Sequence, residues 1–240
     1  MRQKAMNTEN NRLNEWFVPK FGPRGFRIFV GMLFLPYTGM CISFAVLGSM
    51  LATSIIWERV LAISAIYALG LGLAAHAADS LGSRKSKPWG NYFSHKQLWF
   101  IVLVSLSSAY SIGIYYMILF TPMLWIIAIL EGFFVFAYNF EIFGGFFHTS
   151  FWFSMSWGSL PVIAGFVIQT NHIEILPIIL SVITGLLSYI HIRVSRRYKE
   201  YKREGRTDTD TAKLELVLKN ISLATITAVS AILILRVVSG

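Results

Sequence analysis

The sequence has few of the charged residues that keep a soluble protein in water. Only 14% of its 240 residues are Asp, Glu, Lys or Arg, whereas 55% are hydrophobic and 15% are aromatic. A soluble domain has about 25% charged residues, and a disordered chain has few apolar ones. The mean hydropathy of +0.59 argues against both classes. The sequence therefore predicts an integral membrane protein.

The sequence contains almost no cysteine, and this excludes two further kinds of structure. The single residue, Cys41, lies within a long apolar run. One cysteine cannot form a disulfide within the chain, and it cannot supply a Cys-based metal site. The first 24 residues are polar, so we expect no cleavable signal peptide. No short-period repeat and no stretch typical of a soluble second domain is evident.

Long intervals without charge indicate how often the chain crosses a membrane. A helix needs about 20 apolar residues to span the hydrocarbon core. The charge-free intervals run from Arg27 to Glu58, Arg59 to Asp79, Lys96 to Glu131, Glu141 to Glu174, Glu174 to Arg193, and beyond Lys219. The part from Lys96 to Glu141 is long enough for two helices, with a turn at Thr121-Pro122. The sequence thus predicts an all-α fold, a polytopic membrane helix bundle of about seven transmembrane helices, centred roughly on positions 40, 67, 108, 131, 159, 184 and 225.

Lys and Arg are distributed unevenly among the predicted loops. Six precede the first span, four lie between the second and third, and eight lie between the sixth and seventh. Short loops rich in these residues stay in the cytoplasm. We therefore expect a cytoplasmic tail over 1–24, a transmembrane domain over 25–240, a cytoplasmic amino terminus and an external carboxyl terminus. Membrane orientation explains the net charge of +9, so no nucleic acid partner is predicted.

Polar residues gather at the predicted cytoplasmic ends of the helices. His76 and Asp79 are three residues apart, so they share one helical face. Asn139, Glu141 and His148 occupy a Gly-rich connection without Lys or Arg. Such a connection between two apolar helices is expected to pack inside the protein or to line a cavity. The simpler alternative is that the charged residues of these two groups are solvated at helix ends and that the glycines cap the helices.

Two further features contain charged side chains. Arg193, Arg196, Arg197 and Lys199 follow the sixth span, where arginine forks could bind phosphate oxygens. The alternative is an anchor that only sets the orientation. Glu131 lies near the middle of the fourth span. A carboxylate at that depth is a functional candidate, and a protonated Glu bonded to a Ser, Thr or Trp on another helix is an equal alternative.

The stretches Leu73–Lys85, LAAHAADSLGSRK, and Ala137–Thr170, AYNFEIFGGFFHTSFWFSMSWGSLPVIAGFVIQT, contain both of the first two groups. They resemble the UbiA superfamily of intramembrane prenyltransferases. The first is similar to a His-Ala-x-Asp variant of the family's first aspartate motif, and the second to the region around its fifth helix. Arg24–Gly39 fits the family's opening helix more loosely. The resemblance covers most of the first 195 residues.

The resemblance implies a UbiA-like bundle around a central cavity, which binds an isoprenyl diphosphate and a lipid or aromatic acceptor within membrane lipids. Asp79 and Glu141 would hold Mg²⁺, and His76, Asn139 and His148 would complete the catalytic group. The residues that would bind the diphosphate are Arg84, Lys85, Arg196 and Arg197.

The chain also departs from the family pattern. The second aspartate motif, expected after span six, is replaced by an Arg-rich segment, and about seven spans stand where the family has nine. Two functions therefore remain open: a prenyltransferase, or a non-catalytic membrane protein that binds a lipid or quinone in the same cavity. A transporter is a third alternative. It would be expected to have internal repeats or helices broken at mid-membrane, and neither is evident in the sequence.

Overall fold

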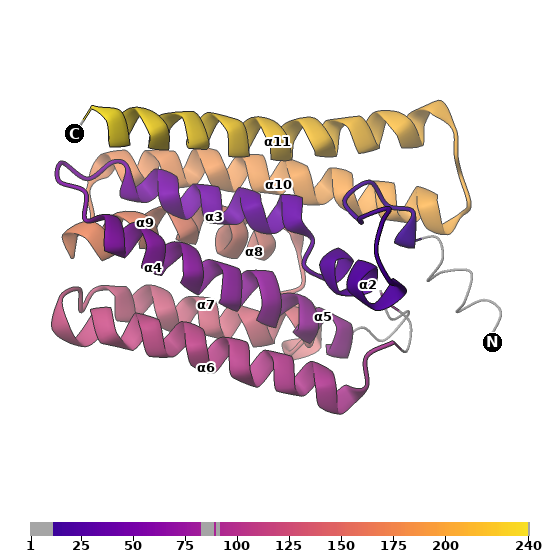
Figure 1. Cartoon of the computed structure of the whole chain (residues 1–240), viewed down its shortest axis with the longest axis horizontal. Helices are drawn as coiled ribbons and strands as arrows, with labels where there is room; N and C mark the ends of the chain where they lie inside the picture. Colours follow the sequence, from indigo (N-terminus) through magenta and orange to yellow (C-terminus); the bar gives the residue numbers. More distant parts are fainter. Residues whose placement is uncertain (1–11, 83–88, 90–91, 240) are drawn as a thin grey trace.

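The computed structural model describes residues 12–82, 89 and 92–239, and its regular structure is entirely helical over these ranges. Long helices lie side by side in alternating directions, and the first and last described residues are at opposite ends of the bundle (Figure 1). The helices are α2 (Arg24–Met32), α3 (Leu35–Ser49), α4 (Trp57–Tyr67), α5 (His76–Gly82), α6 (His95–Leu119), α7 (Leu124–Asn139), α8 (Ser150–Ser154), α9 (Leu160–Thr170), α10 (Ile175–Arg203) and α11 (Thr209–Val238). A π-helical segment, Ala68–Ala75, joins α4 to α5, and a second, Met155–Ser159, joins α8 to α9; a short 3-10 turn, Phe143–Gly145, follows α7.

The predicted membrane helix bundle is confirmed at the level of six to seven apolar helices. Within the described ranges, six helices, counted with their joined segments, are long and apolar enough to cross a membrane, and α7 is a shorter apolar helix. Each of the seven predicted centres falls within one of these helices. The predicted turn at Thr121-Pro122 is the break between α6 and α7. The 16 residues of α7 reach about 24 Å, less than the roughly 30 Å of the hydrocarbon core.

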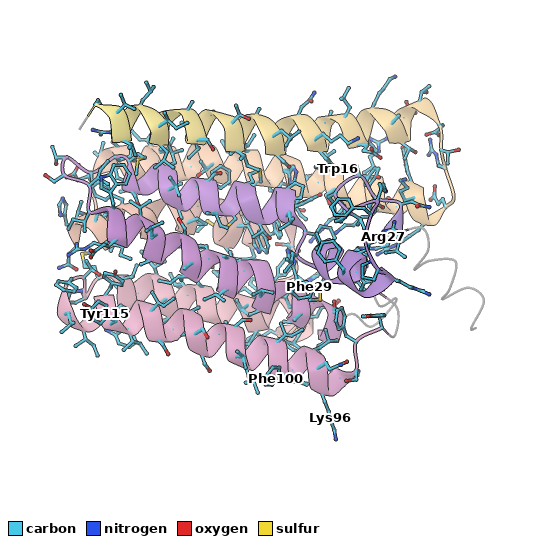
Figure 2. The ribbon with its side chains drawn as sticks, in the orientation of Figure 1. Trp16, Arg27, Phe29, Lys96, Phe100 and Tyr115 are labelled. Carbon is cyan, nitrogen blue, oxygen red and sulfur yellow. The ribbon has the colours of Figure 1, made fainter. Side chains whose placement is uncertain are left out.

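Outward-facing apolar side chains mark the surfaces that would meet lipid. Phe100 and Tyr115 on α6 are 67% and 52% exposed, and both project away from the bundle in Figure 2. In Figure 1, α11 lies along one edge of the bundle beside α10, and α6 lies along the opposite edge. The helices between them, above all α3 and α9, form the packed interior.

Small residues allow α3 and α9 to pack closely at this interior. A Cβ on Gly165 of α9 would collide with the Ala45 carbonyl of α3, and one on Gly48 would collide with the Val162 carbonyl. The Ser49 hydroxyl donates a hydrogen bond to the Gly165 carbonyl at 2.9 Å. Membrane helices associate through such close contacts and hydrogen bonds, because lipid supplies no hydrophobic drive between them.

Part of the predicted tail packs against the end of the bundle where α2 lies, which we call the α2 end. Leu13 and Val18 are buried in the main core. The Arg27 guanidinium donates hydrogen bonds to the carbonyls of Pro19 at 2.7 Å and Leu13 at 2.9 Å. These contacts fold residues 12–23 back over the helix ends. The α2 end also contains the carboxyl ends of α5, α7 and α10 (Figure 1).

Candidate functional site

Phe34 occupies the break between α2 and α3, at the centre of a group of aromatic and charged side chains. Its backbone is left-handed, with a φ of 44°, and its side chain is only 9% exposed. The centroid of its ring is 5.2 Å from that of His76 on α5. The Lys199 Nζ on α10 lies 5.2 Å from the ring centroid, and the Arg12 Cζ lies 5.8 Å from it. Together with Asp79, one turn beyond His76, we call these five residues the Phe34 cluster.

Charges of both signs meet in the Phe34 cluster. The half-buried Asp79 carboxylate attracts both Arg12 and Lys199. Burial lowers the pKa of the Arg12 guanidinium, and the carboxylates of Glu15 and Asp79 oppose that shift. Arg203 repels both Arg12 and Lys199. Three cations therefore face two carboxylates, and the excess of positive charge favours an anionic ligand.

The carboxyl ends of α5 and α7 meet beside this cluster. A Cβ on Gly82 would collide with the Asn139 carbonyl, so glycine at this position permits the approach. Asn139 is buried, and its side-chain amide donates to the Val135 carbonyl at 2.8 Å. Asp79 and Asn139 thus belong to helix ends that touch. One amide hydrogen of Asn139 is already bonded within its own helix.

Tyr138, His148 and Arg196 form a second polar group at the α2 end. The Tyr138 and His148 rings stack at 4.5 Å, and His148 Nδ1 lies 2.9 Å from the Tyr138 carbonyl oxygen. The Arg196 guanidinium donates to the Tyr138 hydroxyl at 3.2 Å, to Ser150 Oγ at 3.2 Å and to the His148 carbonyl at 3.4 Å. Glu141 lies in the turn before His148, half-buried and with a φ of 50°. The predicted site residues His148 and Arg196 are therefore in direct contact.

The other predicted site residues are placed differently. Arg197 is exposed and donates hydrogen bonds to the Tyr201 hydroxyl. Arg84 and Lys85 lie outside the described residues. Within the described ranges, no group of three or more His, Cys, Asp and Glu side chains is arranged to hold a metal ion. Joint binding of Mg²⁺ by Asp79 and Glu141 therefore stays a prediction.

Two members of the Phe34 cluster, Arg12 and Phe34, were not among the residues selected from the sequence, and Lys199 was selected only as part of the basic run after the sixth span. Arg12 and Phe34 reach it through the fold-back of residues 12–23 and the break before α3. Lys199 has a clearer pattern, because it continues a buried stripe of small and polar residues along α10. That stripe consists of Ser181, Thr184, Ser188, His191 and Ser195. Its spacing of three and four residues marks the inward face of the helix.

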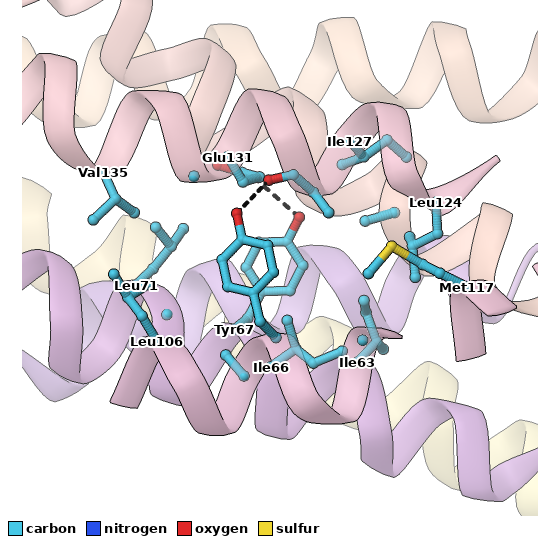
Figure 3. Close-up of a pocket in the computed structure, with 17 residues that line it drawn as sticks. Ile63, Ile66, Tyr67, Leu71, Leu106, Met117, Leu124, Ile127, Glu131 and Val135 are labelled. Atoms are coloured by element: carbon cyan, nitrogen blue, oxygen red, sulfur yellow. Dashed lines mark hydrogen bonds between the residues drawn. The ribbon is translucent and has the colours of Figure 1, made fainter. Parts of the chain in front are cut away.

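An apolar cavity lies deeper in the bundle, between α4, the first π-helical segment, α6 and α7 (Figure 3). Its volume is about 70 Å³, and Glu131 lies on its wall. Glu131 accepts hydrogen bonds from the Tyr67 hydroxyl at 3.1 Å and from Ser156 Oγ at 2.6 Å. A bond to a serine on another helix is one of the two alternatives that the sequence left open. The carboxylate is thus paired rather than exposed to lipid.

Two further hollows adjoin this cavity, one smaller and one larger. Towards the α2 end, a pocket of about 10 Å³ is lined in part by Asn139 and Trp157. It shares Leu71 and Val135 with the apolar cavity. The Trp157 ring in turn lies 5.2 Å from the ring of His76. Towards lipid, an open hollow of about 390 Å³ shares the lining residues Tyr110 and Gly132 with the cavity.

Comparisons with known proteins add no relative. No protein-family model matches the chain, and no match was found among curated proteins or solved structures. The likeness of the two motifs to UbiA prenyltransferases therefore stays an expectation from the sequence.

Proposed function

We propose that this protein is an intramembrane prenyltransferase, which moves an isoprenyl group from an isoprenyl diphosphate to a lipid or aromatic acceptor. The observation that carries the proposal is the Phe34 cluster, whose cations, carboxylate and rings lie near a small pocket that adjoins the apolar cavity. An isoprenyl diphosphate has an anionic head and a long apolar tail. Its head matches the charge of the cluster, and its tail matches the apolar lining of the cavity and of the open hollow of about 390 Å³ towards lipid.

Each kind of side chain in the cluster would have its own role in the reaction. The bond between C1 of the isoprenyl group and oxygen breaks, and its electron pair leaves with the diphosphate. A bond then forms between C1 and the acceptor, which loses a proton. Lys199 and Arg12 would stabilise the negative charge on the leaving diphosphate. The rings of Phe34 and Trp157 would face the positive charge on the isoprenyl group.

Asp79 fits the role of a Mg²⁺ ligand. Magnesium is usually held by one or two carboxylates together with phosphate oxygens of the substrate. Asp79 supplies one half-buried carboxylate, and Glu141 is the predicted second. When bound, the ion would add positive charge next to the diphosphate.

Binding without catalysis is the second candidate, and one observation favours it. Among the described residues, no group of three or more His, Cys, Asp and Glu side chains is arranged to hold a metal ion. Arg12 and Lys199 could hold the anionic head of a lipid without any bond being broken. The same apolar hollows would then take its tail.

Release of diphosphate separates the two functions. We would reconstitute the full chain in phosphatidylcholine nanodiscs and supply Mg²⁺ with radiolabelled farnesyl or geranylgeranyl diphosphate. The proposal expects release by the wild type and none by Asp79→Asn, which keeps size but removes the charge. Asp208→Asn removes the same charge from an exposed position at the α2 end, so it should release diphosphate at close to the wild-type rate.

Each other outcome has a definite meaning. Wild-type release by Asp79→Asn would end the assignment of Asp79 as metal ligand. A wild type that retains the labelled donor but releases no diphosphate would favour the binding function. In that case Lys199→Gln should still weaken retention of the donor, and the exposed Lys213→Gln should not.

A further inference from the structure

We propose that an open groove between α8, α10 and α11 binds the phosphate headgroup of an anionic glycerophospholipid. The groove lies at the α2 end and has a volume of about 540 Å³. Its walls include Ser150, Arg193, Arg196, Arg197, Glu200 and Leu214. We call it the arginine groove. It is separate from the Phe34 cluster, and the proposal does not depend on prenyl transfer.

The arginines of the arginine groove form no ion pair among the described residues. Each arginine donates a hydrogen bond to a neutral tyrosine hydroxyl: Arg193 to Tyr189 at 3.1 Å, Arg196 to Tyr138 at 3.2 Å, and Arg197 to Tyr201 at 2.9 Å. The ion pairs of the described chain involve other residues. With Glu200 as the acidic residue on its wall, the groove has an excess of two positive charges. Tyrosine contacts hold the guanidinium groups while leaving other N–H groups for a phosphate.

The surface next to the groove indicates a lipid rather than a free anion. An exposed apolar stripe on α10 consists of Ile179, Ile183, Leu186 and Ile190, whose exposures are 53%, 55%, 60% and 52%. The same spacing of three and four residues continues to Arg193 and Arg197. Acyl chains could therefore lie along the stripe while the phosphate of the same molecule reaches the arginines. Helix α10 is one of the candidate membrane spans, so this stripe is placed to meet the hydrocarbon of a bilayer.

The inner and outer faces of α10 keep the two anionic sites apart. Lys199 is half-buried and points to the Phe34 ring. Arg193 and Arg197 are exposed on the outer face. Arg196 lies between the inner and outer faces of α10, and it contacts His148 as well as the groove. We therefore test the proposal at Arg193 and Arg197, which have no contact with the Phe34 cluster.

Lipid titration of the purified full chain in detergent tests the site directly. The probes are dioleoyl phosphatidylglycerol and dioleoyl phosphatidylcholine, and native mass spectrometry counts the lipids retained. We expect one phosphatidylglycerol to be retained in preference to phosphatidylcholine. The double variant Arg193→Gln/Arg197→Gln should bind phosphatidylglycerol about 25-fold more weakly, because each basic side chain at an anionic lipid surface contributes about a factor of five.

A matched control separates a specific site from general charge. Lys96→Gln/Lys213→Gln also removes two positive charges at the α2 end, from exposed positions on α6 and α11 outside the groove. It should change phosphatidylglycerol binding by less than about twofold. Arg193→Lys/Arg197→Lys keeps the charge and should retain most of the binding, which excludes misfolding as the cause of the loss.

Three outcomes would overturn the proposal. The first is an equal loss of binding in the control variant. The second is equal retention of phosphatidylcholine and phosphatidylglycerol by the wild type. The third is displacement of the lipid by inorganic phosphate at millimolar concentration, which would mean a site for free anions. No isoprenyl diphosphate is present in the titration, so the result is independent of the prenyl transfer assay.

Discussion

Replacement of Gly165 by alanine tests the central helix packing most directly. The α9 backbone at Gly165 lies so close to the Ala45 carbonyl of α3 that a methyl group would fall well inside 3.0 Å, a distance that real Cβ atoms essentially never show. The two helices would have to separate by about 1 Å or more. The hydrogen bond from Ser49 to the Gly165 carbonyl, now 2.9 Å long, would then be lost.

The expected loss of stability follows from these two effects. Overpacking of an interior costs about 1–3 kcal/mol. A hydrogen bond between membrane helices contributes about 0.6 kcal/mol on average and about 1.7 at most. Gly165→Ala should therefore lower the free energy of unfolding by about 2–4 kcal/mol. Unfolding in mixed micelles, followed by tryptophan fluorescence, measures this change.

Gly70 supplies a matched control within another membrane helix. A Cβ built there has no neighbour within 4 Å, so the same substitution adds a methyl group without a collision. Gly70→Ala should be neutral or should stabilise the protein by up to about 1 kcal/mol, because alanine loses less conformational entropy on folding. Equal unfolding midpoints for the two variants would contradict the close approach of α3 and α9.

Three further predictions concern topology, the buried carboxylate and pH. With the native cysteine buried, Arg203→Cys should react with an impermeant thiol reagent only from the cytoplasm, and His172→Cys, at the opposite end of α10, only from outside. Glu131→Leu leaves the hydroxyls of a tyrosine and a serine without their acceptor, so it should lower the free energy of unfolding by about 1–3 kcal/mol. Glu131→Gln keeps an acceptor and should lower the free energy of unfolding less. Hydrogen bonds from Thr211 and Arg206 lower the pKa of Asp208 from 3.8 to about 2; its stabilising contribution is therefore present above about pH 4 and is lost as the pH falls through about 2. The difference in unfolding midpoint between the wild type and Asp208→Asn should shrink over that window, and a constant difference would contradict the assignment.

Helix positions could be predicted from the sequence because hydrocarbon imposes a strong constraint. Every backbone group within a bilayer needs a partner, which makes a long charge-free run helical regardless of its detailed composition. The break at Thr121-Pro122 was predictable for the same kind of local reason, since proline interrupts a helix. The π-helical segments were not, because they depend on how neighbouring helices fit together. The sequence of Ala68–Ala75 has no feature that distinguishes it from other apolar runs.

The candidate site was predictable only where its residues are close in the sequence. His76 and Asp79 share a helical face through local geometry, and the structure retains both in the Phe34 cluster. Arg12 joins Asp79 from 67 positions away through the fold-back of residues 12–23, and Phe34 joins them through its left-handed backbone at the break before α3. Bulky aromatic residues rarely adopt that conformation. No pattern in the sequence predicts the left-handed backbone of Phe34.

The basic run after the sixth span shows how a helix can divide one charge pattern between two sites. Successive residues are turned by about 100° around the helix axis, so Lys199 and Arg197 point in nearly opposite directions although they are neighbours in the run. The buried polar stripe decides which of them faces inward, because only the inner face can meet α3 and α5. One helix therefore presents a cation to the Phe34 cluster and two arginines to the surrounding lipid. Arg197 is thereby assigned to the lipid instead of to the predicted diphosphate ligands, so removal of Lys199 should affect only the donor, and removal of Arg193 and Arg197 only the lipid. An effect of either change on both ligands would mean that the two faces form a single site.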